Sequence, residues 1–444
     1  MKNVFIVCLL SIFLNSCNAQ KSIKYAGIDR TLSLLQNSTK ESPNNVDILF
    51  YGQSIIGGMK TNILVDSLRN LYPNTNITYK HKPIGGFTIP RLIKTAEHDI
   101  FHENPDLIVF HAYDGIKDGL YDSLIKKIRS KMTSDVLLLN HHYVWNVPES
   151  KLKHINKSHD FDSKEIQKIS KKYDCGFVDV RKQWAEYLNN RSIGANELMG
   201  NTIDPNVHPN DKGNALLRSI VLKEFKKRPN FEYNEEKDEI RNSQKEINTS
   251  FFGTRVDLIT IEELNSGAKI KVLVDGKRPS TFKSNYYISR PSKGFKSWMP
   301  AMLNVSLGAT FPVEEKWTLE IYDINREEEN FKFKLYGSLT GFDGDGDLTT
   351  DFISNSNRII INSEDFMLFQ IEEITKKNIP EGFKIEFSVI SLVKDIIELN
   401  NKESKYTLFR GLQAKNHDLS LEVISGSPSI KELLISQPFL EANE

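Results

Sequence analysis

The stretch Val46-Asp47-Ile48-Leu49-Phe50-Tyr51-Gly52-Gln53-Ser54 decides the fold of the first half of this chain. Its apolar run is short and ends at a glycine, which predicts a strand that is buried on both faces, as in a parallel sheet. Gln53 and Ser54 follow directly. They would therefore lie beyond the carboxyl end of the strand, where parallel α/β sheets form their sites.

The same pattern recurs along residues 45–228, where short apolar runs alternate with amphipathic segments. The predicted strands are Asp47–Tyr51, Ile77–Lys80, Asp106–Phe110, Asp135–Asn140 and Gly176–Val180. The predicted helices are Thr61–Leu71, Ile89–Phe101, Leu120–Lys131, Ser163–Lys172, Gln183–Leu188 and Asp211–Lys227. This alternation predicts an α/β domain with a parallel sheet covered by helices on both faces.

A polar and charged segment, residues 229–249, reads as a linker. The pattern then changes, and residues 250–444 contain short alternating runs separated by turn residues. These runs are Arg255–Ile261, Ala268–Val274, Trp317–Tyr322, Phe331–Tyr336, Arg358–Ile361, Phe383–Val389 and Leu419–Val423. Such a pattern is typical of an all-β domain, and we expect one or two β-sandwiches.

The first residues predict export. Lys2 precedes an apolar stretch that ends in Leu14-Asn15-Ser16-Cys17, which resembles a bacterial lipoprotein box. We therefore expect residues 1–17 to be a lipoprotein signal peptide and Cys17 to be lipidated. Residues 18–44 are expected to form a tether and lead-in with one short helix around Arg30 to Leu35. A lipid anchor would hold the protein in the cell envelope, at the outer membrane or in the periplasm. The alternative is secretion with cleavage after Ala19.

Charge and cysteine usage narrow the possibilities further. The 58 basic and 58 acidic side chains give a formal net charge of zero, so no basic excess points to nucleic acid as a partner. After loss of Cys8 with the signal peptide and lipidation of Cys17, only Cys175 is left, so no intramolecular disulfide is expected. Cys175 is predicted to be a small buried side chain.

Ser54 and His208 are the candidate reactive pair. A serine hydroxyl is a poor nucleophile at neutral pH and needs a base within hydrogen-bond reach, together with a group that orients that base. His208 stands shortly before the last predicted helix, and Asp204 lies four residues before it. The alternative is structural: Ser54 would cap a short helix, and His208 would be a surface residue on a loop.

Gly52-Gln53-Ser54 after the first strand, Gly86 after the second, and the late Asp204 and His208 resemble the SGNH (GDSL-like) hydrolase family. The resemblance covers about residues 45–228 and implies a flavodoxin-like three-layer fold with serine esterase activity. It implies that Ser54 is the nucleophile, that the N–H groups of Ser54 and Gly86 line the oxyanion hole, and that His208 is the general base. A Gly-Gln-Ser block also occurs in branches that act on acetylated sugars.

Two blocks depart from the family pattern. The family usually places an Asn after the third strand, whereas this chain has Tyr113 there, which we take as the replacement oxyanion donor. Other donors predicted near the same sheet edge are Asn140, His141 and His142. The family Asp normally lies three residues before the His, where this chain has Pro205. Asp204, one residue earlier, is the candidate to orient His208. The alternative is that no carboxylate is needed and a backbone carbonyl holds the imidazole.

Two further features allow alternatives. Residues 343–347 alternate Asp and Gly like a calcium loop, but the positions that an EF-hand needs are Leu348 and Ser354, so we expect a solvated turn and no metal site. The aromatic side chains of the C-terminal half could form a sugar-binding platform or pack in a core. They are Tyr286, Tyr287, Trp298, Trp317 and Phe342. Core packing is the prediction for Trp317.

These features predict an exported serine esterase that hydrolyses acyl esters, in particular acetyl esters, on a carbohydrate. It would need no cofactor, and its partners would be an acylated glycan and, through the lipid anchor, a membrane. One alternative is a lipase or phospholipase, which a long apolar lid would favour and which this sequence does not show. The other is a non-catalytic surface glycan-binding protein on a decayed hydrolase fold.

Overall fold

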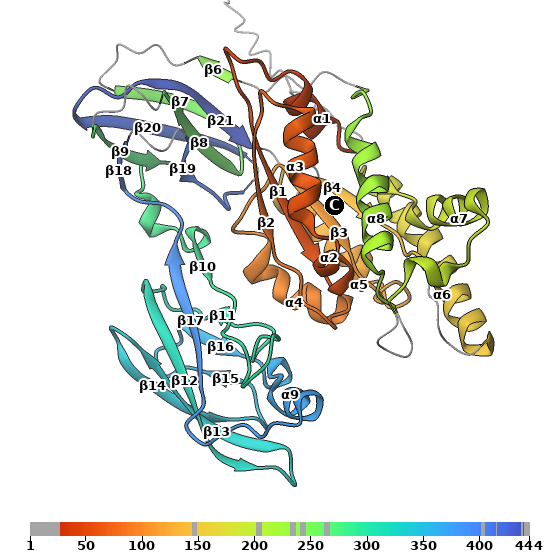
Figure 1. Cartoon of the computed structure of the whole chain (residues 1–444). Helices are drawn as coiled ribbons and strands as arrows, with labels where there is room; N and C mark the ends of the chain where they lie inside the picture. The colour runs from red at the N-terminus through yellow and green to blue at the C-terminus, as the bar shows by residue number, and fades with distance from the viewer. Residues whose placement is uncertain are drawn as a thin grey trace, which may run out of the picture.

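The chain folds into an α/β domain and a β-rich region that lies beside β2 and α4 of that domain (Figure 1). A computed structural model describes residues 27–143, 149–200, 207–230, 237–239, 246–261, 267–400, 405–413, 415–436 and 438. The predicted signal peptide, Cys17 and Ala19 lie outside these residues. Within them, no helix is both long enough and apolar enough to cross a membrane.

Five parallel strands form the sheet of the α/β domain. They are β1 (Asn45–Gly52), β2 (Asn76–His81), β3 (Leu107–His111), β4 (Asp135–Leu139) and β5 (Gly176–Val178). Their order is β2-β1-β3-β4-β5, which is the flavodoxin-like order, and the predicted fold is confirmed. The direction of winding reverses between β1 and β3, so a crevice opens at the carboxyl ends of these two strands.

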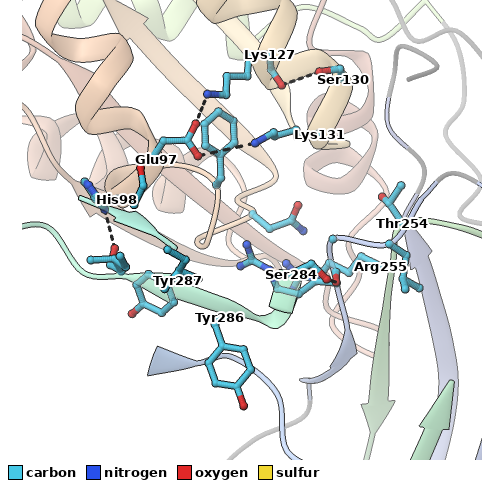
Figure 2. Close-up of a pocket in the computed structure, with 18 of the residues that line it drawn as sticks. Glu97, His98, Lys127, Ser130, Lys131, Thr254, Arg255, Ser284, Tyr286 and Tyr287 are labelled. Atoms are coloured by element: carbon cyan, nitrogen blue, oxygen red, sulfur yellow. Dashed lines mark hydrogen bonds and ion pairs between the residues drawn. The ribbon is translucent and has the colours of Figure 1, made fainter. Parts of the chain in front are cut away.

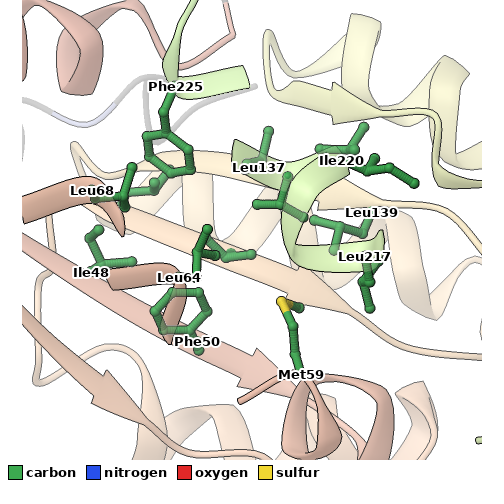
Figure 3. Close-up of a cluster of buried hydrophobic side chains, with 14 of the residues drawn as sticks. Ile48, Phe50, Met59, Leu64, Leu68, Leu137, Leu139, Leu217, Ile220 and Phe225 are labelled. Carbon is green, nitrogen blue, oxygen red and sulfur yellow. The ribbon is translucent and has the colours of Figure 1, made fainter. Parts of the chain in front are cut away.

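Helices cover both faces of this sheet. One face carries α1 (Asp29–Gln36), α3 (Thr61–Leu71), α7 (Val180–Arg191) and α8 (Asp211–Phe225), and the other carries α4 (Ile89–Asp99), α5 (Leu120–Lys131) and α6 (Glu149–Lys172). Successive side chains of a strand point to opposite faces of the sheet, so alternate residues of β1 pack in the two hydrophobic cores on either side of it. Ile48 and Phe50 pack with α3 and α8 (Figure 3), while Leu49 and Tyr51 pack with α4 and α5. Helix α6 begins well before the predicted Ser163.

The β-rich region contains two units with separate cores. The first has the four-stranded sheets β18-β9-β20-β7 and β19-β8-β21-β6. Its strands are β6 (Lys237–Glu239), β7 (Glu246–Gly253), β8 (Arg255–Thr260), β9 (Lys269–Val274), β18 (Ile396–Glu398), β19 (Lys405–Phe409), β20 (Lys415–Ser425) and β21 (Ile430–Ser436). Their pairings are antiparallel, which confirms the expected sandwich architecture.

The second unit is inserted in the chain between β9 and β18. Its sheets are β10-β17-β12-β13-β14 and β11-β16-β15. The strands are β10 (Tyr286–Ile288), β11 (Ser306–Leu307), β12 (Glu315–Asn325), β13 (Asn330–Gly337), β14 (Gly341–Asp347), β15 (Phe352–Ile353), β16 (Ile359–Ile361) and β17 (Lys384–Ser391). The unit also carries a short helix, α9 (Leu368–Thr375), which the strand pattern did not predict.

Three local predictions can be checked in this fold. Trp317 is fully buried in the core of the inserted unit, and Cys175 is buried behind β4, as expected. The solvated turn predicted at residues 343–347 is wrong, because these residues belong to strand β14, which pairs with β13. The Asp343 carboxylate is buried and accepts hydrogen bonds from the backbone N–H and the hydroxyl of Ser356.

The inserted unit shares a core with the α/β domain. Met299, Leu303, Met367 and Ile371 belong to the same buried cluster as the side chains of α4 and α5. Polar groups fix this contact as well. The buried His98 of α4 donates from Nδ1 to the Ile288 carbonyl (2.8 Å), and its Nε2 accepts from the Val305 N–H (3.2 Å). The carboxylate of Asp99 pairs with Arg290 at 2.7 Å.

Candidate active site

Ser54 lies at the crevice between the ends of β1 and β3. The chain reaches it through Gly52, which has a φ of +142°. A Cβ at Gly52 would lie 2.1 Å from the carbonyl oxygen of His111, so only glycine allows this close approach of the two strands. Gln53 occupies the N-cap position, and Ser54 is the first residue of α2 (Ser54–Gly58). Ser54 is therefore not the cap of this helix.

His208 reaches Ser54 from the loop before α8, and its Nε2 lies 2.9 Å from Ser54 Oγ. Several contacts hold this loop. The His208 carbonyl accepts from the Gly200 N–H (2.8 Å), and the Asn210 side chain caps α8 by accepting from the Gly213 N–H (3.0 Å). Partial burial lowers the pKa of His208 below its usual range, so the imidazole is neutral, and able to accept a proton, at neutral pH.

Asp204, the residue predicted to orient His208, lies outside the described residues. The described part of the loop begins at Val207, whose carbonyl accepts a hydrogen bond from Nε2 of His142 (3.0 Å). His142 follows β4, so a side chain from the neighbouring sheet edge holds the backbone next to His208.

Gly86 lies in the turn after β2, next to the Ser54 segment. The Ile84 N–H donates to the carbonyl of Gly52 (2.9 Å), which ties the start of the turn to the end of β1. Gly86 has a φ of +79°, a conformation that favours glycine. The predicted oxyanion glycine therefore stands at the same sheet edge as the predicted nucleophile.

The inserted β unit reaches this turn. The Trp298 indole N–H donates to the carbonyl of Gly85 (3.0 Å), and 53% of Trp298 is exposed. The methyl group of Met299 lies 3.5 Å from where a Cβ of Gly86 would stand. Of the aromatic residues that were considered as a sugar platform, Trp298 is thus the one beside the candidate site.

Gln53 links Ser54 to a row of buried imidazoles. The Ser54 hydroxyl donates to Gln53 Oε1 (2.8 Å), Gln53 Nε2 lies 3.4 Å from His111 Nδ1, and His111 Nε2 lies 3.1 Å from His141 Nδ1. One arrangement of hydrogen atoms satisfies all three contacts. In it, Gln53 Nε2 donates to His111 Nδ1, and His111 Nε2 donates to His141 Nδ1. Burial lowers the pKa of His111 to about 3, so His111 is neutral and can accept at Nδ1.

His111, His141, His142 and His159 form what we call the histidine cluster. Burial lowers the pKa of each one, to about 3 for His142 and about 4 for His159. In the described part of the chain, no group of three or more His, Cys, Asp or Glu side chains is arranged to hold a metal ion. The cluster is neutral, and His111, His141 and His142, at the ends of β3 and β4, make hydrogen bonds, whereas His159 Nδ1, on α6, is buried without a partner among the described residues.

Tyr113, the predicted replacement for the family Asn, packs against this cluster. Its ring stacks on His159, with 5.0 Å between centroids and 17° between planes, and lies 4.4 Å from the His141 ring. The Tyr113 hydroxyl is buried and has no hydrogen-bond partner among the described residues. Burial raises its pKa, so the hydroxyl keeps its proton and can donate it. Its role as an oxyanion donor stays a prediction.

Asn140, a further predicted donor, is engaged elsewhere. Its Nδ2 donates to Asp179 Oδ1 (2.9 Å), and its Oδ1 accepts from the Arg181 N–H (3.0 Å). Because both ends of the amide join β4 to the start of α7, Asn140 has a structural function. His141 and His142 are likewise held by His111 and by the Val207 carbonyl.

No protein-family model matches the chain, and neither does any curated protein. Among solved structures, the chain is similar to an acetylxylan esterase from Geobacillus stearothermophilus, with 19% identity, a TM-score of 0.34, and coverage of 40% of this chain and 94% of that one. It is also similar to a two-domain esterase active on acetylated mannans, with 12% identity, a TM-score of 0.36, and coverage of 93% and 96%. Similarities this distant leave the function to be argued from the geometry of the site.

Proposed function

We propose that this protein is an exported serine esterase that removes acyl groups, in particular acetyl groups, from a glycan. The observation that carries the proposal is the 2.9 Å contact between Ser54 Oγ and His208 Nε2 at the carboxyl edge of the sheet. A nucleophile, a neutral base and the turn that carries the predicted oxyanion donor Gly86 lie at this edge, and acyl transfer requires these three parts.

In the proposed mechanism, the Ser54 hydroxyl turns its single proton from Gln53 Oε1 to His208 Nε2, which takes the proton as Ser54 Oγ attacks the ester carbonyl carbon. The backbone N–H groups of Ser54 and Gly86 hold the negative oxygen of the tetrahedral intermediate, with Tyr113 as the predicted third donor. His208 then gives the proton to the departing sugar oxygen, and the acyl group stays on Ser54. Water, deprotonated by His208, then attacks the acyl carbon, and His208 returns the proton to Ser54 Oγ as the acid leaves. Asp204 is proposed to orient the imidazole. No step requires a cofactor.

Trp298 supports a sugar substrate. An exposed indole beside the oxyanion turn offers a flat apolar face, and aromatic side chains are common in small-molecule sites. Trp298 and Met299 also crowd the turn, which favours a short acyl group such as acetyl. The contact between Ser54 and His208 favours catalysis over a decayed hydrolase that only binds glycans.

We further propose that the protein is anchored in the cell envelope through Cys17, with secretion as the alternative. Incorporation of a labelled fatty acid into the wild-type protein, but not into Cys17→Ser, tests this proposal.

Replacement of the nucleophile tests the activity. Purified protein is assayed against acetylated glycans and against aryl esters of increasing chain length. We expect hydrolysis of acetyl esters, and a loss of kcat of about three or more orders of magnitude in Ser54→Ala with an unchanged melting temperature. Ser219→Ala, at an exposed position of α8, is the matched control.

Three results would contradict the proposal. Equal activity of Ser54→Ala and wild type would show that Ser54 is not the nucleophile. A preference for long acyl chains would favour a lipase. Glycan binding without hydrolysis of any ester would favour the decayed hydrolase.

A further inference from the structure

A cavity of about 700 Å³ opens where α4 and α5 meet the two β units (Figure 2). It is distinct from the candidate active site. Its α/β residues belong to the last turns of α4 and α5 and to the segments that follow them, including Glu97, Lys127 and Lys131. Because α4 and α5 lead into the starts of β3 and β4, the cavity lies at the amino edge of the sheet, whereas Ser54 lies at the carboxyl edge.

The charged side chains that line this cavity are mostly cationic. We call it the cationic cavity, after Lys127, Lys131, Arg255 and Arg410, and Glu97 is the one carboxylate that lines it. Glu97 contacts both lysines, at 3.8 Å in the case of Lys131. Arg255 pairs with the buried Asp257 outside the lining, at 2.8 Å. The lining therefore carries more positive charge than Glu97 and Asp257 together balance.

Arg410 is the group whose pairing is incomplete. It follows β19, and its guanidinium is largely buried in the wall of the cavity. Its Nη1 is buried and has no hydrogen-bond partner among the described residues. A buried cationic donor without a partner is costly, because the lost hydration is not replaced.

Electrostatics agree with this geometry. Burial, together with nearby Arg255, lowers the pKa of Arg410 to about 10, so the side chain is still charged at neutral pH but is destabilised. Burial also lowers the pKa of Lys131, with smaller contributions from Lys127 and Arg410. A bound anion would favour the charged form of both side chains.

We propose that the cationic cavity binds an acidic sugar residue, with its carboxylate held by Arg410 and Lys131. A guanidinium fork matches a planar carboxylate, and the cavity volume is in the range of small-molecule sites. Asn104, Ser284 and Tyr287 also line it and supply polar groups for sugar hydroxyls. The anion site does not depend on esterase activity. The choice of a saccharide rests on the proposed function.

Binding of D-glucuronate tests this proposal. The full chain carrying Ser54→Ala is titrated by calorimetry with glucuronate, D-glucose and sulfate at low and high salt. We expect glucuronate to bind, and to bind at least about tenfold more tightly than glucose, with an affinity that falls as salt is added. Arg410→Ala should weaken glucuronate binding at least about tenfold, whereas Arg410→Lys, which keeps the charge, should weaken it less.

Lys316→Met is the matched control, because Lys316 is an exposed cation on β12 that is not among the residues that line the cavity. It should bind glucuronate like the parent. If Arg410→Ala does not fold, Lys131→Met and Arg410→Lys carry the test. Equal binding of glucose and glucuronate, binding of sulfate without glucuronate, or unchanged binding in both cavity variants would overturn the proposal.

Hydrolysis of an aryl acetate separates this inference from the proposed function. Arg410→Ala in the otherwise wild-type chain should hydrolyse it at the wild-type rate, because the cavity lies at the other edge of the sheet from Ser54. If the protein binds glucuronate but has no esterase activity, the anion site is supported and the proposed function is wrong. If it has esterase activity but does not bind glucuronate, the proposed function is supported and the anion site is wrong.

Discussion

The two edges of the sheet hold buried polar groups in opposite ways. At the carboxyl edge, the histidine cluster is neutral, and His111, His141 and His142 are held by hydrogen bonds. At the amino edge, the cationic cavity keeps Arg410 charged, with its Nη1 buried and without a hydrogen-bond partner in the part of the chain that the structure describes. Because unpaired buried polar groups are costly, a satisfied group serves to position its neighbours, while an unsatisfied one points to a ligand.

The same criterion selects two neighbouring groups at the carboxyl edge. The Tyr113 hydroxyl and His159 Nδ1 are both buried without a hydrogen-bond partner among the described residues, whereas His111 and His141 lie within hydrogen-bond distance of each other. Tyr113→Phe removes this hydroxyl and keeps the ring that stacks on His159. We expect kcat for an acetyl ester to fall by about two to three orders of magnitude, with no loss of thermal stability. Kinetics and melting curves measured on the same preparation check this.

A neutral result for Tyr113→Phe would assign the third oxyanion contact to another group. Tyr187→Phe on α7, a tyrosine outside the cluster, is the control for loss of a hydroxyl. It should leave kcat unchanged.

Gln53 is a polar side chain whose hydrogen-bonding groups both have partners. Its Oε1 accepts a hydrogen bond from the Ser54 hydroxyl and its Nε2 lies against His111, so we interpret it as a positioning residue for the nucleophile. Gln53→Met keeps the length of the side chain but loses both contacts. We expect kcat to fall by up to about 100-fold while KM stays within about threefold, because misplacement of the reacting group acts on the chemical step.

The measurement for Gln53→Met is the separation of kcat from KM. Gln183→Met, on α7, is the matched control and should change neither. If KM rose while kcat stayed at the wild-type value, Gln53 would contact substrate rather than position Ser54.

The sequence predicts the α/β sheet well because the apolar patterns of its strands and helices each lie within a short stretch of chain. The apolar run at Val46–Tyr51 and the helix periodicities each lie within one element, so β1, α3 and α5 appear nearly where they were expected. The contact between Ser54 and His208 also agrees with the expectation from the quoted motifs. Gln53 was visible within the Gly-Gln-Ser block, but no pattern showed that its amide lies against His111.

What the sequence does not predict depends on contacts between distant segments. Trp298 reaches Gly85 across 213 residues of sequence, and Arg410 and Lys131 line one cavity only because two β units dock on α4 and α5. The alternating Asp and Gly residues of 343–347 resembled a turn, yet pairing with β13 makes them a strand. Tertiary pairing overrides local preference at such positions.

The smallest expected effect concerns stability against pH. Burial holds the pKa of His111 and His142 near 3 in the folded protein, whereas an unfolded histidine titrates at about 6.5. Between these values only the unfolded chain takes up the proton. The free energy of unfolding is therefore highest above about pH 6.5 and falls as the pH is lowered toward 4, by up to ~1.4 kcal/mol per pH unit for each histidine.

Denaturant unfolding between pH 7 and pH 5 checks this slope. His142→Gln removes one imidazole of the cluster and should make the slope shallower, even if it lowers stability at pH 7. His154→Gln, at an exposed position of α6, should leave the slope unchanged. Arg410→Ala should do so too, because a guanidinium with a pKa near 10 stays charged throughout this range. A steeper loss of stability in Arg410→Ala than in wild type would show that the two edges of the sheet are coupled. An unchanged slope in His142→Gln would show that the cluster takes up protons without unfolding, so that its neutrality is not what holds the loop before His208 in place.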